Sequence, residues 1–272
     1  MERTVPKNRN GGNVNYKLLV ETAVLAGEIM LSSGAETYRV EDTMGHILKT
    51  SKCESIEALA LMTGIIATIS SDEMEHPITV MRTINDRNTN LANIIKVNDI
   101  SRKYCGGMLS LEEAYAQLKG VHQKLYSSTV FNIATAGIAM GFAMMFGGSM
   151  MDVLATVFVG AFLAFCIFFG KKIKMNSILA DVFSCAGIAI AAMGIKTFGL
   201  PEIDMDIVII SAIMPVVPGV AITNAIRDTL QGDYLSGCAR ILEAFLKAAS
   251  IAIGIGIGMA LFGMWIGGGV IW

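Results

Sequence analysis

The sequence predicts a membrane protein with a small cytosolic α+β domain followed by an α-helical bundle of about five transmembrane helices. The mean hydropathy is +0.57. Residues 1–126 hold 14 Lys/Arg and 15 Asp/Glu, whereas residues 127–272 hold only 7 and 8. A bilayer span needs about 20 mostly apolar residues, and five such segments follow one another, at about 128–147, 149–170, 176–198, 206–226 and 239–263. The prediction is a disordered tail (1–14), a cytosolic domain (15–126) and a transmembrane domain (127–272).

The N-terminal domain alternates helical and extended patterns. Apolar residues recur with helical spacing over 16–32, and further helices are predicted over 36–52, 89–104 and 110–125. Ser110 and Glu113 have the spacing of a capping box at the start of the last one. Residues 56–70 and 78–84 favour strands, with a turn over 71–77.

Charge and composition exclude several classes of partner. The net charge is −2 and no basic face is apparent, which excludes nucleic acid as a partner. The five cysteines and three histidines are scattered without metal-ligand spacing, so no metal site, cofactor or disulfide framework is predicted.

The loops between the spans predict an orientation. With the N-terminus in the cytoplasm, the inside loops carry most of the basic residues, namely Lys171, Lys172, Lys174, Arg227 and Arg240. The outside loops then carry Lys196 together with Asp152, Glu202, Asp204 and Asp206. This distribution follows the positive-inside rule and places the C-terminus outside.

The fourth span contains residues that interrupt a helix. Pro215 and Pro218 lie three residues apart and Gly219 follows. Each proline removes a backbone donor, and backbone groups freed inside a bilayer must face protein or water. Interrupted helices of this kind form substrate sites in many transporters, although a simple proline kink is the alternative.

Polar residues follow this break with helical spacing. Asn224, Arg227 and Asp228 share one helix face, and Arg227 is suited to hold a carboxylate through two hydrogen bonds. We therefore expect these three residues, with Pro215, Pro218 and Gly219, to bind a small polar solute. The alternative is an interfacial salt bridge that anchors the topology.

Ionisable residues inside predicted spans are functional candidates. Asp181 in the third span and Glu243 in the fifth are the candidates for proton coupling. Glu243 is also placed to pair with Lys247 one turn later, and Asp181 could instead reach the membrane interface.

Glycines four residues apart indicate close helix packing. These pairs are Gly137 with Gly141 and Gly254 with Gly258. At the membrane interface, Trp265 and Trp272 suit the aromatic belt.

Two segments carry a resemblance to a known family. They are SSGAETYRVEDTM (32–44) and MPVVPGVAITNAIRDTLQGDYLSGCARILEAFLKA (214–248). The sequence resembles the ThrE-type threonine/serine exporters over about residues 16–263, and most of all their shorter, split YjjP-like members. The resemblance implies export of threonine, serine or small dicarboxylates, driven by a proton or ion gradient, across the bacterial inner membrane.

The resemblance also implies partners and site residues. Full-length members carry a second hydrophobic half, so a YjjB-like second membrane subunit is expected, with a higher homo-oligomer left open. The first motif contributes Gly34, Glu36, Arg39 and Glu41; docking of the soluble domain is one expectation for it, and a solvated ion-pair face is the plainer reading. Rival functions are a membrane-anchored enzyme and a sensor or assembly subunit.

Overall fold

A computed structural model describes residues 15–72, 74–121 and 127–266. The chain divides into two compact units. The first comprises residues up to 123 together with 220–241, and the second comprises 124–219 and 242–272. The predicted tail (1–14), Trp272 and the expected domain boundary at 126 lie outside the described residues.

The first unit contains a three-stranded antiparallel sheet of order β1-β2-β3, formed by Ser55–Leu61, Gly64–Ser70 and Ile78–Thr83. Alternate residues of β2 point into the core, and Ile65, Ala67 and Ile69 are buried. One continuous strand over 56–70 was the expectation, and this was wrong. The chain reverses at Met62 and Thr63, so that Leu61 pairs with Gly64; this turn lacks the Gly, Asn or Asp that usually marks a hairpin.

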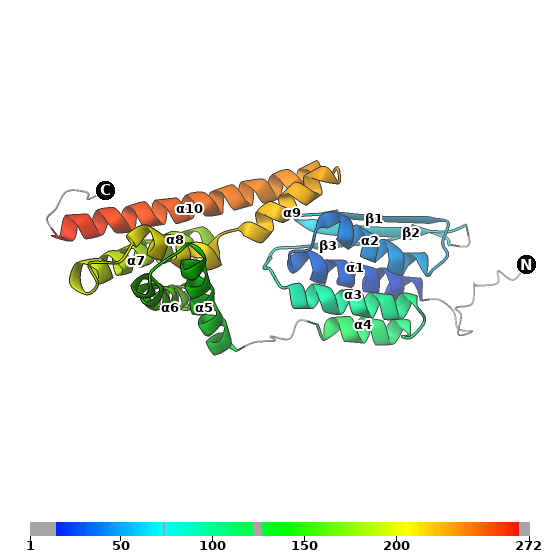
Figure 1. The fold of residues 1–272 in the computed structure, drawn as a ribbon. Coiled ribbons are helices and arrows are strands. Elements are labelled where there is room, and N and C mark those ends of the chain that lie inside the picture. Colours follow the sequence, from blue (N-terminus) through cyan, green and yellow to red (C-terminus); the bar gives the residue numbers. More distant parts are fainter. Residues whose placement is uncertain (1–14, 73, 122–126, 267–272) are drawn as a thin grey trace, which may run out of the picture. The chain divides into compact units, whose positions relative to one another are not determined.

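Four helices cover one side of this sheet (Figure 1). α1 (Tyr16–Ser32) and α2 (Thr37–Lys49) pack on the strands, and α3 (Leu91–Cys105) and α4 (Leu111–Lys119) lie beyond them. The predicted capping box at Ser110 and Glu113 is present at the start of α4. The core is aliphatic and centres on α1, whose Leu19, Ile29 and Met30 are fully buried.

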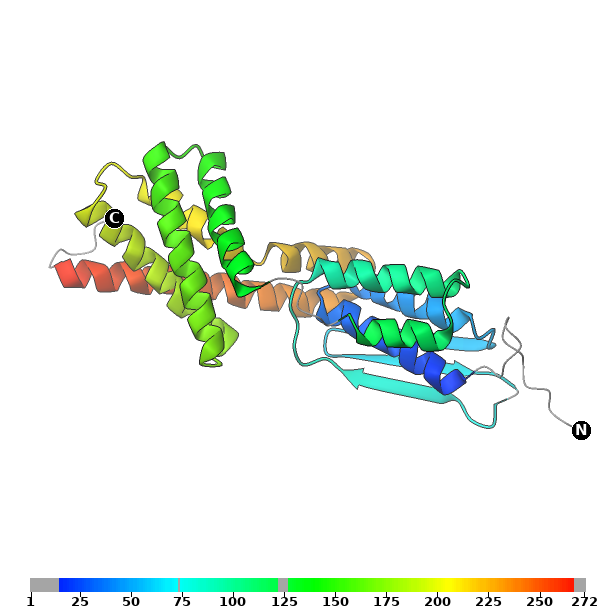
Figure 2. The same cartoon turned by 90° about the horizontal axis from the view of Figure 1, so that it is seen from below.

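The second unit is helical and apolar. It contains α5 (Ser128–Met145), α6 (Met150–Lys172), α7 (Ser177–Phe198), α8 (Met205–Ile213) and the short 3-10 turn η1 (Met214–Val216). α6 packs against α5, α7 and α8, and Figure 2 shows α5 beside α6. Asp152 joins two helix starts, because its carboxylate accepts hydrogen bonds from the backbone N–H groups of Ser149 (2.7 Å) and Asp204 (2.7 Å).

Several helices are suited to a bilayer. α6, α7 and α10 (Tyr234–Ile266) are long and apolar enough to cross one, and α8 with α9 (Gly219–Leu230) forms a broken pair that could count as a fourth span. α5 is apolar but shorter. A membrane protein is therefore indicated, while the expected number of five spans stays a prediction.

Glycine packing differs between the two expected pairs. A Cβ added at Gly254 or Gly258 would collide with the α7 backbone at Val182 or Ala186, whereas one at Gly256 would meet nothing within 4 Å. α10 thus turns its Gly254–Gly258 face onto α7. At Gly137 and Gly141 an added Cβ would also meet nothing within 4 Å among the described residues. The prediction that a second helix packs closely at these two glycines was therefore wrong.

Candidate functional site

The two sequence motifs meet inside the first unit, where the loop between α1 and α2 packs against α9. Gly34 turns this loop with a φ of +85°, in the left-handed region that favours glycine. Its carbonyl accepts a hydrogen bond from Asn224 Nδ2 at 2.7 Å. Residues about 190 positions apart in the sequence are thereby joined.

Asp228 lies at the centre of this contact and is fully buried. Its carboxylate accepts hydrogen bonds from the Thr37 backbone N–H (2.9 Å), the Thr37 hydroxyl (3.1 Å) and Arg240 Nε (2.8 Å). Arg240 in turn donates from Nη2 to the Ala35 carbonyl at 2.7 Å. A buried carboxylate requires such hydrogen-bond partners, and both oxygens of Asp228 have them.

Asp228 also supplies a helix cap. Thr37 is the first residue of α2, and the N-cap residue Glu36 makes no side-chain capping bond there. The first N–H groups of a helix lack internal partners, and negative charge stabilises a helix N-terminus. A side chain of α9 therefore takes the role that the α2 sequence leaves unfilled.

Glu36 forms a second, more open ion cluster beside the first. Its carboxylate accepts hydrogen bonds from Arg227 Nη1 (2.5 Å) and Arg39 Nη1 (3.3 Å). The Glu36 side chain is 6% exposed, whereas Arg227 is 56% and Arg39 40% exposed. Burial acts to raise the pKa of Glu36, but its backbone hydrogen bond, the bond from Arg227 and the two guanidinium charges outweigh burial and hold the pKa below its ordinary value.

Glu41 differs from Glu36 in its electrostatic environment. It accepts a hydrogen bond from the Ala60 backbone N–H at 2.9 Å, which ties α2 to β1. Burial raises the pKa of Glu41, and the negative charges of Asp233 and Asp228 add to this effect. Burial and Asp228 likewise raise the pKa of Asp233, so negative charge accumulates on this side of the cluster.

The expected interruption of the fourth span is present. Pro215 lies in η1, Val217 is extended, and α9 begins at Gly219 directly after Pro218. These three predicted site residues belong to the second unit, whereas Asn224, Arg227 and Asp228 belong to the first. Their joint role in solute binding stays a prediction.

Inside the second unit, Lys247 Nζ of α10 lies 4.0 Å from Asp181 Oδ2 of α7. Helical spacing pairs Lys247 with Glu243 on the same helix. It offers Asp181 no local basic partner beyond Lys172 and Lys174. The contact between Asp181 and Lys247 was not predicted, because helical spacing detects only neighbours on the same helix.

Three contributors to the site were not predicted as site residues: Ala35, Thr37 and Arg240, the last of which was named only for the orientation of the loops. All lie within the two motifs, Ala35 and Thr37 in the first and Arg240 in the second. An arginine among the apolar residues of 234–266 was the available signal, because a charge there requires a partner.

A comparison with known proteins places both motifs within one family match. Residues 21–262 match the ThrE family, described as "Putative threonine/serine exporter". A "Probable threonine/serine exporter" of Mycobacterium tuberculosis (strain ATCC 25618 / H37Rv) is 22% identical over 255 residues, covering 92% of this chain and 48% of that protein. The chain thus spans about half the length of this curated relative. No solved structure matches the chain. Since the match covers most of its length, the chain belongs to the ThrE family of threonine/serine exporters.

Proposed function

We propose that this chain is a subunit of a secondary transporter that exports a small amino acid, such as threonine or serine, or a small dicarboxylate. A proton or ion gradient drives export. The N-terminal domain lies in the cytoplasm and the C-terminus outside the bacterial inner membrane. A YjjB-like subunit supplies a second membrane half, in keeping with a relative about twice as long.

One observation carries the proposal beyond family membership. The helix α9, which begins just after the break at Pro215–Pro218, is held to the loop at 33–37 by the buried Asp228–Arg240 pair and by Glu36–Arg227. An interrupted helix beside polar groups is how many transporters form their sites. The bonded cluster gives this helix a fixed anchor in the N-terminal domain.

Arg227 is the residue that binds the solute carboxylate. Only Nη1 is engaged with Glu36, and the side chain is 56% exposed. The remaining N–H groups of its guanidinium can form a two-pronged bond to a second carboxylate. Within the second unit, the interrupted backbone at Pro215, Pro218 and Gly219 offers polar groups that a solute could contact.

Asp228 has a different role in this proposal. Its carboxylate is fully buried and already engaged with Thr37 and Arg240. It is therefore a positioning residue that sets the place of Arg227, one residue earlier on α9. Asn224, bonded to Gly34, acts in the same way.

The Asp181–Lys247 pair is the proton-coupling element, with Glu243 as the other candidate. A carboxylate and an ammonium group within apolar helices neutralise each other, and protonation of Asp181 would release Lys247. The two groups lie on different helices, α7 and α10. A change of protonation would thereby alter the contact between these helices.

The test is efflux of preloaded threonine, serine or succinate from cells that carry this chain and a YjjB-like partner. We expect Arg227→Ala to abolish efflux and Arg82→Ala to leave it unchanged. Arg82 is a matched control, because its side chain is also 56% exposed and faces a glutamate, Glu28, at 4.0 Å. If cells with Arg227→Ala export the solute as fast as cells with the unmodified chain and the same partner, the role assigned to Arg227 is refuted.

A further inference from the structure

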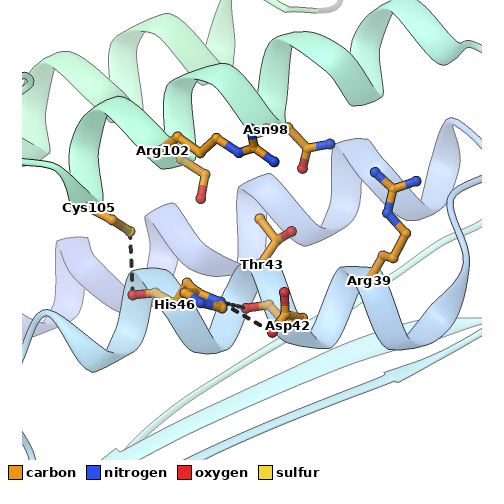
Figure 3. Close-up of a pocket in the computed structure, with 8 residues that line it drawn as sticks. Arg39, Asp42, Thr43, His46, Asn98, Arg102 and Cys105 are labelled. Atoms are coloured by element: carbon orange, nitrogen blue, oxygen red, sulfur yellow. Dashed lines mark hydrogen bonds and ion pairs between the residues drawn. The ribbon is translucent and has the colours of Figure 1, made fainter.

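A polar pocket of about 260 Å³ lies between α2 and α3 (Figure 3). Four side chains come from each helix, with the same spacing of i, i+3, i+4 and i+7. They are Arg39, Asp42, Thr43 and His46 from α2, and Asn98, Ser101, Arg102 and Cys105 from α3. This spacing normally carries the apolar seam between two packed helices. Here the facing positions are polar, although the neighbouring Val40, Met44 and Val97 are buried in the core.

The floor of the pocket is polar. Thr43 is only 8% exposed, and its hydroxyl lies between the two helices in Figure 3. Among the described residues this hydroxyl makes no hydrogen bond, and it is not one of the buried unsatisfied side-chain atoms, so it is open to the pocket. An open hydroxyl can donate a hydrogen bond to a ligand or accept one from it.

The walls carry two guanidinium groups. Arg39 donates one hydrogen bond, from Nη1, to Glu36. The guanidinium of Arg102 makes no hydrogen bond or ion pair within the described ranges, although the backbone carbonyl accepts one from Gly106. Two arginines with open N–H groups facing one small cavity suit a carboxylate.

A carboxylate in the same pocket restricts the charge that a ligand can carry. Asp42 is 69% exposed and lies 3.3 Å from His46 Nδ1. It would repel a phosphate or a second carboxylate and would accept a hydrogen bond from an ammonium group. Asn98 and Thr43 add an amide and a hydroxyl that can bond to a short polar side chain.

We propose that this pocket binds a free α-amino acid with a small polar side chain. Arg39 and Arg102 hold its carboxylate, Asp42 holds its ammonium group, and Thr43 and Asn98 contact its side chain. The site lies within the N-terminal domain, apart from the Asp228 cluster.

The pocket is coupled to the Glu36 cluster through one shared residue. Arg39 bonds Glu36, and Glu36 also bonds Arg227 of α9. A ligand carboxylate that engages Arg39 competes with Glu36 for it, and binding at one site then changes affinity at the other by linkage. The domain would thereby sense the internal solute concentration, a consequence that rests on the proposed transport function.

The test is calorimetric titration of the purified full chain with L-serine, L-threonine, succinate and inorganic phosphate. We expect the two amino acids to bind and the two anions to bind more weakly. Arg102→Gln should weaken amino-acid binding about ten- to a hundredfold, the effect of losing a hydrogen bond to a charged group. Arg82→Gln is the control and should change nothing.

Asp42→Asn gives a sharper outcome. It should weaken amino-acid binding and strengthen succinate binding, because the repulsive charge is removed. Tighter binding of phosphate or succinate than of serine by the unmodified chain, or unchanged serine affinity in Arg102→Gln, would overturn the proposal. Arg227→Ala should still bind serine in the pocket, with an affinity shifted only by the linkage through Glu36, so this result and the efflux test of Arg227 can fail independently.

Discussion

The Asp228 carboxylate accepts the Thr37 backbone N–H at 2.9 Å, so that α9 caps the N-terminus of α2. The same carboxylate holds Arg240, which bonds the Ala35 carbonyl. One buried acidic group thus joins α2, α9 and α10 with the loop before α2. This relationship makes the cluster sensitive to single substitutions.

Replacement of Asp228 by Ala should destabilise the first unit strongly. It leaves the Arg240 charge buried without its partner and the Thr37 N–H unbonded, a change that costs about 3–5 kcal/mol. Denaturant unfolding of the purified chain measures the loss. Asp99→Ala is the control, because Asp99 bonds Lys103 in an exposed pair worth about 0–1 kcal/mol. Equal stability of the two variants would contradict the capping role.

Removal of charge from Glu36 should change the acid sensitivity of the fold. A carboxyl with a lowered folded-state pKa stabilises the fold above its ordinary value of 4.5 and loses this contribution as pH falls through the folded pKa. The unmodified chain should therefore lose stability in this acid range, and Glu36→Gln should lose less. The measurement is the thermal unfolding midpoint at a series of pH values; parallel curves for the two proteins would refute the assignment.

The opposite sign is expected for Glu41. Its pKa is raised in the fold, so the ionised form is disfavoured and lowers stability at neutral pH. Glu41→Gln should stabilise the chain at pH 7 while keeping an acceptor for the Ala60 N–H. The gain should shrink as pH falls through the folded pKa and vanish below the ordinary value of 4.5. A destabilised variant at pH 7 would contradict this account.

Gly34 and Gly45 provide a matched pair for the loop before α2. Gly34 has a φ of +85°, so Gly34→Ala should cost about 1–2 kcal/mol in backbone strain. Gly45 lies inside α2, and an added Cβ there would meet nothing within 4 Å. Gly45→Ala should therefore stabilise the helix by roughly 0.5–1 kcal/mol. Thermal unfolding of the two variants checks both signs.

The glycines of α10 allow a similar comparison in the second unit. Gly258→Ala places a Cβ against the backbone of Ala186 on α7, whereas Gly256→Ala places one in open space. We expect the first to lower the thermal unfolding midpoint in detergent and the second to leave it nearly unchanged. Similar midpoints for both variants would show that α7 and α10 do not pack through this face.

The sequence by itself determined the charge-poor C-terminal half, the break at Pro215–Gly219 and the two motifs. These follow from composition and from rules that act within one helix, such as the length of a span and the loss of a donor at proline. The helices over 16–32 and 89–104 were predictable for the same reason. The reversal at Met62 was not, because its residues carry no turn signal.

Only the tertiary structure decided which charges meet. Asp228 with Thr37 and Arg240, Glu36 with Arg227, and Asp181 with Lys247 are each joined across separate elements. The strength of an ion pair depends on distance and burial, and neither is set by the spacing of residues along one chain. The polar pocket between α2 and α3 was hidden for the same reason, since two helix faces form it only when they are packed together.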